Sequence, residues 1–155
     1  MMSILRAPQI KQKISQKISR LLKQQSLAVL GTHGKNEAYQ SLVAFTVHNN
    51  LKNILFATDK NTRKYRNIKE HPKVAVLVDN RLNKRDDFYK TIAVTALGVA
   101  RETNNVERKK LLKVHEARHP AIKAFLQKRE CALFKIKVSS YYLVSHFQQV
   151  HEIVV

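Results

Sequence analysis

The stretch FATDKNTRKYRNIKEHPKVAVLVDN, residues 56–80, decides the fold. It opens with an apolar strand that ends at Thr58, and a short polar turn leads into a helix over 61–71. Pro72 ends that helix, because the residue before a proline is pushed away from helical geometry. Residues 73–80 then read as a nearly all-apolar strand, which predicts burial on both of its faces. The chain therefore crosses from one strand to the next through a single short helix.

On the N-terminal side, short strands alternate with tight turns. The strand patterns are LAVLGT (27–32), EAYQSLVAFTV (37–47) and ILFAT (54–58), and the turns between them are HGKN (33–36) and HNNLKN (48–53). Before them, isoleucines and leucines at helical spacing in residues 8–25 predict an amphipathic helix that packs its apolar stripe on the domain. The polar side of this helix is basic, so a position on a membrane surface is the alternative.

The C-terminal side adds a polar loop (81–88), a long strand (89–102), two helices (104–118 and 120–128) and a last strand (131–145). About six strands result, most of them joined by tight turns, whereas a doubly wound parallel sheet would need helices between most strands. We therefore expect a mainly β (α+β) fold: one domain over residues 1–155, built as a six-stranded closed or split barrel with peripheral helices. Residues 1–25 contain the N-terminal helix, and 104–128 form a helical excursion.

The composition fits one globular domain, with 155 residues of which 44% are apolar and 26% charged. The net charge of +18 attracts polyanions, but the basic residues are scattered, so nucleic-acid recognition is not favoured. The single cysteine, Cys131, cannot form an internal disulfide and favours a reducing, cytoplasmic location. No apolar run has the length of a membrane span, and the N-terminus does not look like a signal peptide, so no membrane role is expected.

Residues 115–119, HEARH, match the zinc-protease signature H-E-x-x-H. On a helix, the two histidines would share one face and bind zinc, and Glu116 would act as general base. His119 directly precedes Pro120, however, and therefore falls at a helix end. No downstream motif selects a third ligand. The favoured interpretation is a helix end with solvent-facing histidines, so we expect neither a metal site nor a metalloprotease.

The start of the helix after residue 61 has the chemistry of an anion site. Thr62, Arg63 and Lys64 bring a hydroxyl, a guanidinium and an ammonium group to a helix N-terminus, where free backbone N–H groups and the helix dipole favour negative charge. Arginine suits bidentate phosphate binding, and lysine adds a point charge. An Arg-Lys pair at a helix start is by itself more often solvated surface, so the surrounding order of elements matters.

That order resembles the FMN-binding split-barrel family around pyridoxamine 5′-phosphate oxidase. The matching pieces are YQSLVAF (39–45), ILFAT (54–58), TRKYRNI (62–68), HP (71–72) and VAVLVDN (74–80), followed by ALGVARE (96–102) and LLKVHEARHP (111–120). The resemblance covers roughly residues 20–147. It implies a six-stranded split barrel that forms a homodimer and binds FMN at the subunit interface.

The resemblance also implies a set of cofactor-binding residues. The FMN phosphate would be held by Thr62, Arg63 and Lys64, and the ribityl and phosphate path would be lined by Thr58 and Asp59. The isoalloxazine ring would lie along Ser41, Leu42, Val43, Ala44 and Phe45. Asn80, at the end of the next strand, completes the set. A flavin needs such a combination of a flat apolar slot, a few polar groups and cations for its phosphate. Catalytic residues and the second subunit's contribution stay unassigned.

The C-terminus departs from the pyridoxamine phosphate oxidases themselves. The chain ends in SHFQQVHEIVV, without their Arg-rich segment that grips the substrate phosphate, and it has no tryptophan. The leading prediction is therefore a flavin-dependent oxidoreductase acting on an unidentified small molecule. The alternatives are a haem-binding or haem-degrading protein that uses His146 or His151 as iron ligand, and a non-catalytic module that binds FMN or nucleic acid. F420 in place of FMN is also open.

Overall fold

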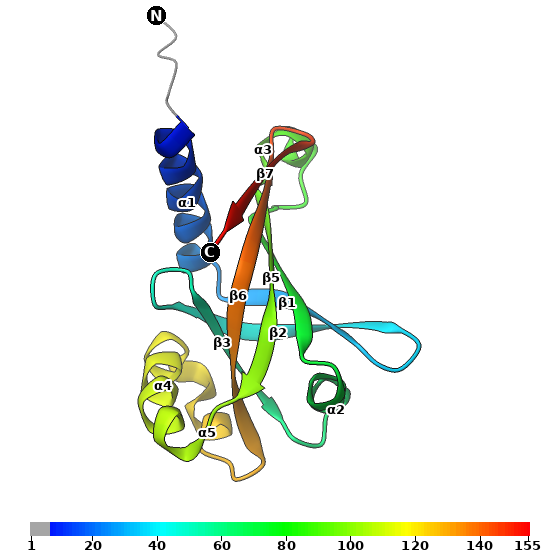
Figure 1. Cartoon of the computed structure of the whole chain (residues 1–155), viewed down its shortest axis with the longest axis vertical. Coiled ribbons are helices and arrows are strands. Elements are labelled where there is room, and N and C mark those ends of the chain that lie inside the picture. Colours follow the sequence, from blue (N-terminus) through cyan, green and yellow to red (C-terminus); the bar gives the residue numbers. More distant parts are fainter. Residues whose placement is uncertain (1–6) are drawn as a thin grey trace, which may run out of the picture.

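A computed structural model describes residues 7–155, which form a closed antiparallel barrel of six strands (Figure 1). The barrel strands are β1 (Leu27–His33), β2 (Ala38–His48), β3 (Asn53–Asp59), β4 (Lys73–Asp79), β5 (Ala93–Glu102) and β6 (Cys131–Ser145). They follow the order β3-β2-β1-β4-β5-β6, and pairing of β3 with β6 closes the barrel. The predicted six-stranded barrel is confirmed.

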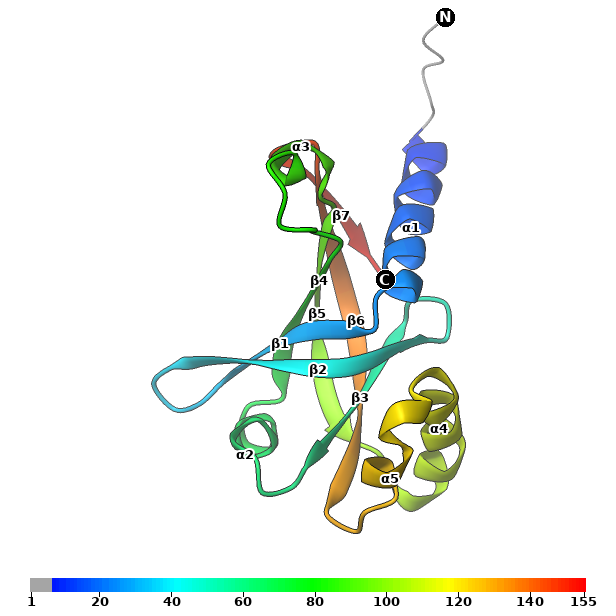
Figure 2. The ribbon, with the colours of Figure 1, turned by 180° about the vertical axis from the view of Figure 1, so that it is seen from behind.

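The helices lie at the periphery, also as predicted. They are α1 (Ala7–Gln24), α2 (Arg63–Glu70), α3 (Asp87–Lys90), α4 (Asn105–Arg118) and α5 (Lys123–Leu126), with a 3₁₀ turn (Pro120–Ile122) between the last two. Seen from behind, α2, α4 and α5 gather at one end of the barrel, and α1 and α3 lie at the other (Figure 2). Among residues 7–155, no helix is long and apolar enough to cross a membrane.

Helix α1 packs on the barrel mainly with its second half, and Ile14 adds a partly buried contact. Ile18, Leu21 and Leu22 are buried, which confirms the predicted apolar stripe. The first turns are exposed, and Ile10 keeps 42% of its surface accessible.

Aromatic side chains from neighbouring strands fill the barrel interior. Phe56 and Phe134 stack with ring centroids 5.2 Å apart, and the edge of Tyr65 meets Phe134 at 5.7 Å. Both phenylalanines are almost fully buried, so each contributes roughly 1.5–3 kcal/mol of hydrophobic stabilisation. Because Tyr65 belongs to α2, the same contacts fix α2 on the barrel.

Strand β4 is buried on one face only, so the prediction that residues 73–80 are covered on both faces is wrong for the single chain. Val74, Val76 and Val78 point into the core, while Ala75 and Leu77 stay half-exposed. A barrel strand always turns one face outward, and an all-apolar sequence does not tell whether anything covers that face.

A seventh strand, β7 (Gln149–Val154), extends the sheet beyond β6 and was not predicted. It is reached through a tight turn in which His146, Phe147 and Gln148 have φ values of 48°, 51° and 73°. Left-handed backbone at three residues that are not glycine gives no turn signal in the sequence. The predicted strand over 89–102 also starts later, at Ala93, because α3 occupies residues 87–90.

Candidate functional site

The turn between β3 and α2 is held by its own side chains. The hydroxyls of Thr58 and Thr62 lie 3.0 Å apart, and the Thr62 hydroxyl donates to the Asp59 carbonyl at 2.8 Å. The Asp59 carboxylate accepts from the backbone N–H of Asn61 at 2.7 Å, and Thr62 caps α2 by accepting from Tyr65 N. The helix therefore begins where the sequence predicts, with the neighbouring N–H groups fixed in direction.

Lys64 is the cation of this turn that lacks a partner. It is half-buried, and within residues 7–155 no carboxylate lies at ion-pair distance from it. Burial lowers the pKa of Lys64, although the charge of Asp59 acts in the opposite direction. A half-buried ammonium group without an ion-pair partner is an unfavourable arrangement that a bound anion would relieve.

Arg63 is engaged on the surface. Its guanidinium pairs with Glu37 and lies over the ring of Tyr39, 4.6 Å from the ring centre. Both Arg63 and Glu37 are exposed, so the pair is weak and a phosphate can replace the carboxylate. The sequence did not predict the contacts of Arg63 with Glu37 and Tyr39, although both residues lie in the stretch assigned to the strand next to the flavin.

Strand β2 has a free edge next to this turn. Its residues 45–48 pair with β3, whereas residues 38–44 have β1 on one side and no strand of residues 7–155 on the other. Phe45 N donates to Ser26 O on the β1 side. Since backbone groups alternate in direction along a strand, those of Gln40, Leu42 and Ala44 face the free edge. They are available to a planar ligand with a polar rim.

The alternation divides the five residues predicted to line the ring. Val43 and Phe45 point into the core and are buried, so their side chains cannot contact a ligand there. Leu42 is 66% exposed. Ser41 lies on the same side of the strand as Val43 and Phe45, and its hydroxyl is buried without a hydrogen-bond partner among the described residues.

Asn80 is not brought to this site within the chain. It follows the end of β4 that lies away from α2 (Figure 2), and its side-chain oxygen accepts from Ile92 N at 2.8 Å. Its backbone N–H also donates to Ile92 O at 3.3 Å. The structure gives Asn80 a local task, holding the loop between β4 and β5, and its role in cofactor binding stays a prediction.

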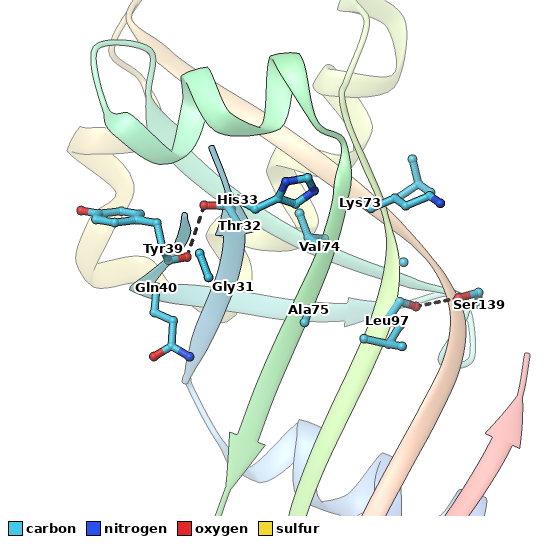
Figure 3. A pocket seen from close by; sticks show the side chains of 13 residues that line it. Gly31, Thr32, His33, Tyr39, Gln40, Lys73, Val74, Ala75, Leu97 and Ser139 are labelled. Atoms are coloured by element: carbon cyan, nitrogen blue, oxygen red, sulfur yellow. Dashed lines mark hydrogen bonds between the residues drawn. The ribbon is translucent and has the colours of Figure 1, made fainter. Parts of the chain in front are cut away.

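A shallow pocket of about 600 Å³ lies on the outer face of the barrel (Figure 3). Its lining consists of Gly31, Thr32, His33, Ala38, Tyr39, Gln40, Lys73, Val74, Ala75, Leu97, Gly98, Val99 and Ser139. Small and apolar side chains of β1, β4 and β5 dominate, and the cationic Lys73 lies at the rim. The pocket does not include the Thr62–Lys64 turn, but Tyr39 borders both.

The outer face continues as apolar rows across the strands. The register places Leu42, Val29, Leu77 and Thr95 side by side on four successive strands. Leu27 at 52%, Leu42 at 66% and Leu97 at 38% are exposed although they are large and apolar. A continuous apolar face of this kind marks an interaction surface.

The two histidines of HEARH are buried, so the prediction of solvent-facing histidines is wrong. His115 is fully buried and shares a hydrogen bond of 2.9 Å between its Nδ1 and the Thr46 hydroxyl. His119 Nε2 donates to the Phe45 carbonyl at 2.7 Å. His119 does form the C-cap of α4, which confirms the helix end predicted from the position of Pro120. Sequence spacing could not show that this face of the helix packs on β2, where backbone and hydroxyl groups need partners.

These contacts give the histidines a structural task next to the free edge of β2. Within the described part of the chain, no three His, Cys, Asp or Glu side chains gather as metal ligands. Arg118, from the same helix, donates to the carbonyls of Lys23 and Gln25 at 2.6 and 2.8 Å and so ties α4 to the end of α1. The C-terminal end of α4 therefore fixes the position of β2.

Because His115 is buried, we expect the protein to lose stability in mild acid. Burial, with the neighbouring charges of His119 and Arg118, lowers the pKa of His115 from 6.5 to about 4. The unfolded chain then binds a proton that the folded chain rejects, so stability is complete above pH 6.5 and falls as the pH drops toward 4. We expect this group to remove roughly 2 kcal/mol between pH 7 and 4.5.

The measurement is urea unfolding at both pH values for the parent and for His115→Gln. The variant should lose less stability on acidification than the parent, by about the same 2 kcal/mol. An equal loss in both proteins would show that His115 is not responsible.

A six-stranded barrel with a Thr-Arg-Lys helix start beside a free strand edge defines the split-barrel class. A family model described as pyridoxamine 5′-phosphate oxidase matches residues 14–145, so the chain belongs to that family. No curated protein matches.

Solved structures agree on the fold. General stress protein 26 from Bacillus anthracis is 18% identical with a TM-score of 0.72, and the match covers 92% of this chain and 98% of that one. A heme binding protein from Mycobacterium smegmatis is 14% identical with a TM-score of 0.79, covering 90% of this chain but 57% of that longer one. A FAD-binding protein from Mesorhizobium loti is 12% identical with a TM-score of 0.67, covering 81% and 90%. At these identities the likeness concerns the fold.

Proposed function

We propose that this protein is a flavoprotein that binds FMN at the start of α2 and along the free edge of β2. The observation that carries the proposal is Lys64, a half-buried cation without an ion-pair partner among residues 7–155, at a capped helix N-terminus. The FMN phosphate supplies the missing negative charge there. Arg63 leaves Glu37 and adds a bidentate contact.

The ring system then has a matching place along β2. The backbone groups of Gln40, Leu42 and Ala44 face the free edge and can meet the polar rim of the ring. Bound flavin supplies hydride and electron transfer, which makes the protein an oxidoreductase for a small molecule. The chain itself holds the phosphate and orients the ring.

The working unit in this proposal is a homodimer with the flavin between the subunits. The support is the apolar outer face with Leu27, Leu42 and Leu97, which a single chain leaves exposed. A second copy of the chain would cover this apolar face. The free thiol of Cys131 fits a reducing cytoplasm.

Leu97→Glu tests the dimer. A charge placed in an apolar interface must lose its hydration, so we expect dimer affinity to fall by at least about 100-fold and FMN affinity to fall with it. Light scattering after size-exclusion chromatography reads out the mass. Val106→Glu is the matched control, because Val106 is 83% exposed on α4, and it should leave both affinities unchanged. A monomeric parent would refute the interface.

The visible absorption spectrum of the freshly purified protein tests the cofactor. A two-band flavin spectrum that yields FMN by mass after release is the expected result. If the released cofactor is F420 by mass, the proposed binding site would stand, but the redox cofactor would be F420 instead of FMN. A colourless protein that also fails to bind added FMN would overturn the proposal, and a non-catalytic or nucleic-acid-binding role would then come first.

Haem binding is the second candidate. It is supported by the fold shared with the heme binding protein from Mycobacterium smegmatis and by two available histidines, His146 and His151, on the β6–β7 hairpin. His146 is exposed in the turn and touches the Ser145 hydroxyl at 3.3 Å. An intense Soret band that is lost in His146→Ala or His151→Ala would establish this reading in place of the flavin.

A further inference from the structure

A second pocket, of about 350 Å³, lies under α4 and α5 at the end of the barrel. It is formed by the residue after β3, the end of β5, the first turns of α4 and the turn between α5 and β6. Its polar lining includes Lys60, Glu102, Arg108, Lys128, Arg129 and Cys131. Thr62, Arg63 and Lys64 are not part of it, so this pocket is distinct from the proposed phosphate site of FMN.

The pocket holds more positive than negative charge. Its carboxylate, Glu102, is already taken: it accepts from the Tyr65 hydroxyl at 3.0 Å and pairs with Lys69 at 3.3 Å and Lys60 at 3.6 Å. Burial raises the pKa of Glu102, but these hydrogen bonds and charges outweigh it and hold that pKa below its usual value, so the group stays ionised.

The other three cations of the pocket have no negative partner. In the part of the chain from residue 7 to 155, no carboxylate lies within ion-pair distance of Arg108, Lys128 or Arg129. Arg108 is half-buried and Lys128 and Arg129 are exposed, and all three line one half-open pocket. Their like charges repel one another, and a multiply charged anion relieves that repulsion.

Arg108 is held in place for such a contact. Its guanidinium donates to the Leu126 carbonyl at 3.4 Å and also lies against the thiol of Cys131. Burial raises the pKa of the Cys131 thiol despite the opposing effect of Arg108, so the sulfur stays protonated and does not neutralise the arginine. Among residues 7–155 the structure shows no further hydrogen bond from Arg108, which leaves its other N–H groups for a ligand.

We propose that this pocket binds a small phosphate ester or diphosphate, as a site separate from the flavin. Two arginines offer planar forks that match phosphate oxygens, and Lys60 and Lys128 add point charges. The volume suits a small phosphorylated molecule rather than a polymer. The strong positive charge of the whole chain, +18, raises the local concentration of such anions.

The test is a titration of the full-length protein with pyrophosphate at constant ionic strength, followed by backbone amide NMR shifts. We expect shifts at residues 102–108 and 126–131 that saturate with one binding constant. Lys128→Gln with Arg129→Gln should weaken this binding at least tenfold. Both side chains are exposed in a turn and form no hydrogen bond that the structure describes, so the fold should persist.

Two matched variants separate this site from charge in general and from the flavin site. Lys109→Gln with Lys110→Gln removes two exposed charges from α4, which also carries Arg108, but outside the pocket lining, and should leave binding unchanged. Arg63→Ala with Lys64→Ala removes the proposed FMN phosphate site and should also leave these shifts unchanged. Shifts confined to residues 58–66, shifts that never saturate, or equal weakening by both Gln pairs would overturn the proposal.

Discussion

Arg63→Ala combined with Lys64→Ala should weaken FMN binding by at least about 100-fold and leave the fold intact. Each hydrogen bond between a charged group and a phosphate contributes about 1.5–3 kcal/mol, and about 1.4 kcal/mol corresponds to a factor of ten. The fold should persist because Arg63 is exposed and Lys64 has no ion-pair partner among residues 7–155 to lose. Quenching of flavin fluorescence on titration measures the affinity.

Riboflavin provides the matched control ligand, because it has the same ring without the phosphate. The double variant should bind riboflavin as well as the parent does, which would assign the lost affinity to the phosphate alone. Lys11→Ala with Lys13→Ala, two exposed lysines of α1, removes the same charge elsewhere and should leave FMN affinity unchanged. A double variant that binds FMN as tightly as the parent would place the phosphate elsewhere.

Phe134→Ala should cost about 3–5 kcal/mol in the free energy of unfolding, the largest stability effect that we expect. The ring is fully buried, stacks on Phe56 at 5.2 Å and meets the edge of Tyr65 at 5.7 Å. Its removal leaves a cavity between β3, β6 and α2. A loss of this size approaches the total stability of a typical domain, so the variant should be partly unfolded at 37 °C. Urea unfolding at a fixed protein concentration measures the change.

Phe147→Ala is the matched control on the same sheet. Phe147 is 59% exposed in the turn after β6, so the same truncation should change the free energy of unfolding by less than about 0.5 kcal/mol. Similar losses for both variants would mean that the interior contacts of Phe134 are not what holds α2 and the barrel together.

Local patterns in the sequence were sufficient for the barrel and for the helix start. Helix α2 starts at Thr62, as predicted, and the Thr62 side chain caps it, because capping depends on a hydroxyl followed by backbone N–H groups a few residues away. The six barrel strands follow from runs of apolar residues between polar turns. Pro72 and Pro120 mark the ends of α2 and α4 because proline restricts the residue before it.

Other features depend on contacts between distant segments, and local pattern carries no information on them. The burial of His115 and His119 results from α4 packing on β2, about 70 residues away in the sequence, where Thr46 and Phe45 supply their partners. The position of Asn80, away from α2, depends on the direction in which β4 crosses the barrel. The seventh strand follows a turn in which three residues other than glycine have left-handed backbone, and such a turn leaves no signal in the sequence.

By itself, the sequence determined the fold class, the order of the six barrel strands and the helix start that carries Thr62, Arg63 and Lys64, because propensity, capping and periodicity act over a few residues. The tertiary structure decided which groups are free. Among residues 7–155, it left residues 38–44 of β2 without a pairing strand on one side, Lys64 without an ion-pair partner and three cations around a second pocket. Whether a strand edge is free or a charge is unpaired depends on the neighbouring residues, and only folding brings those neighbours together.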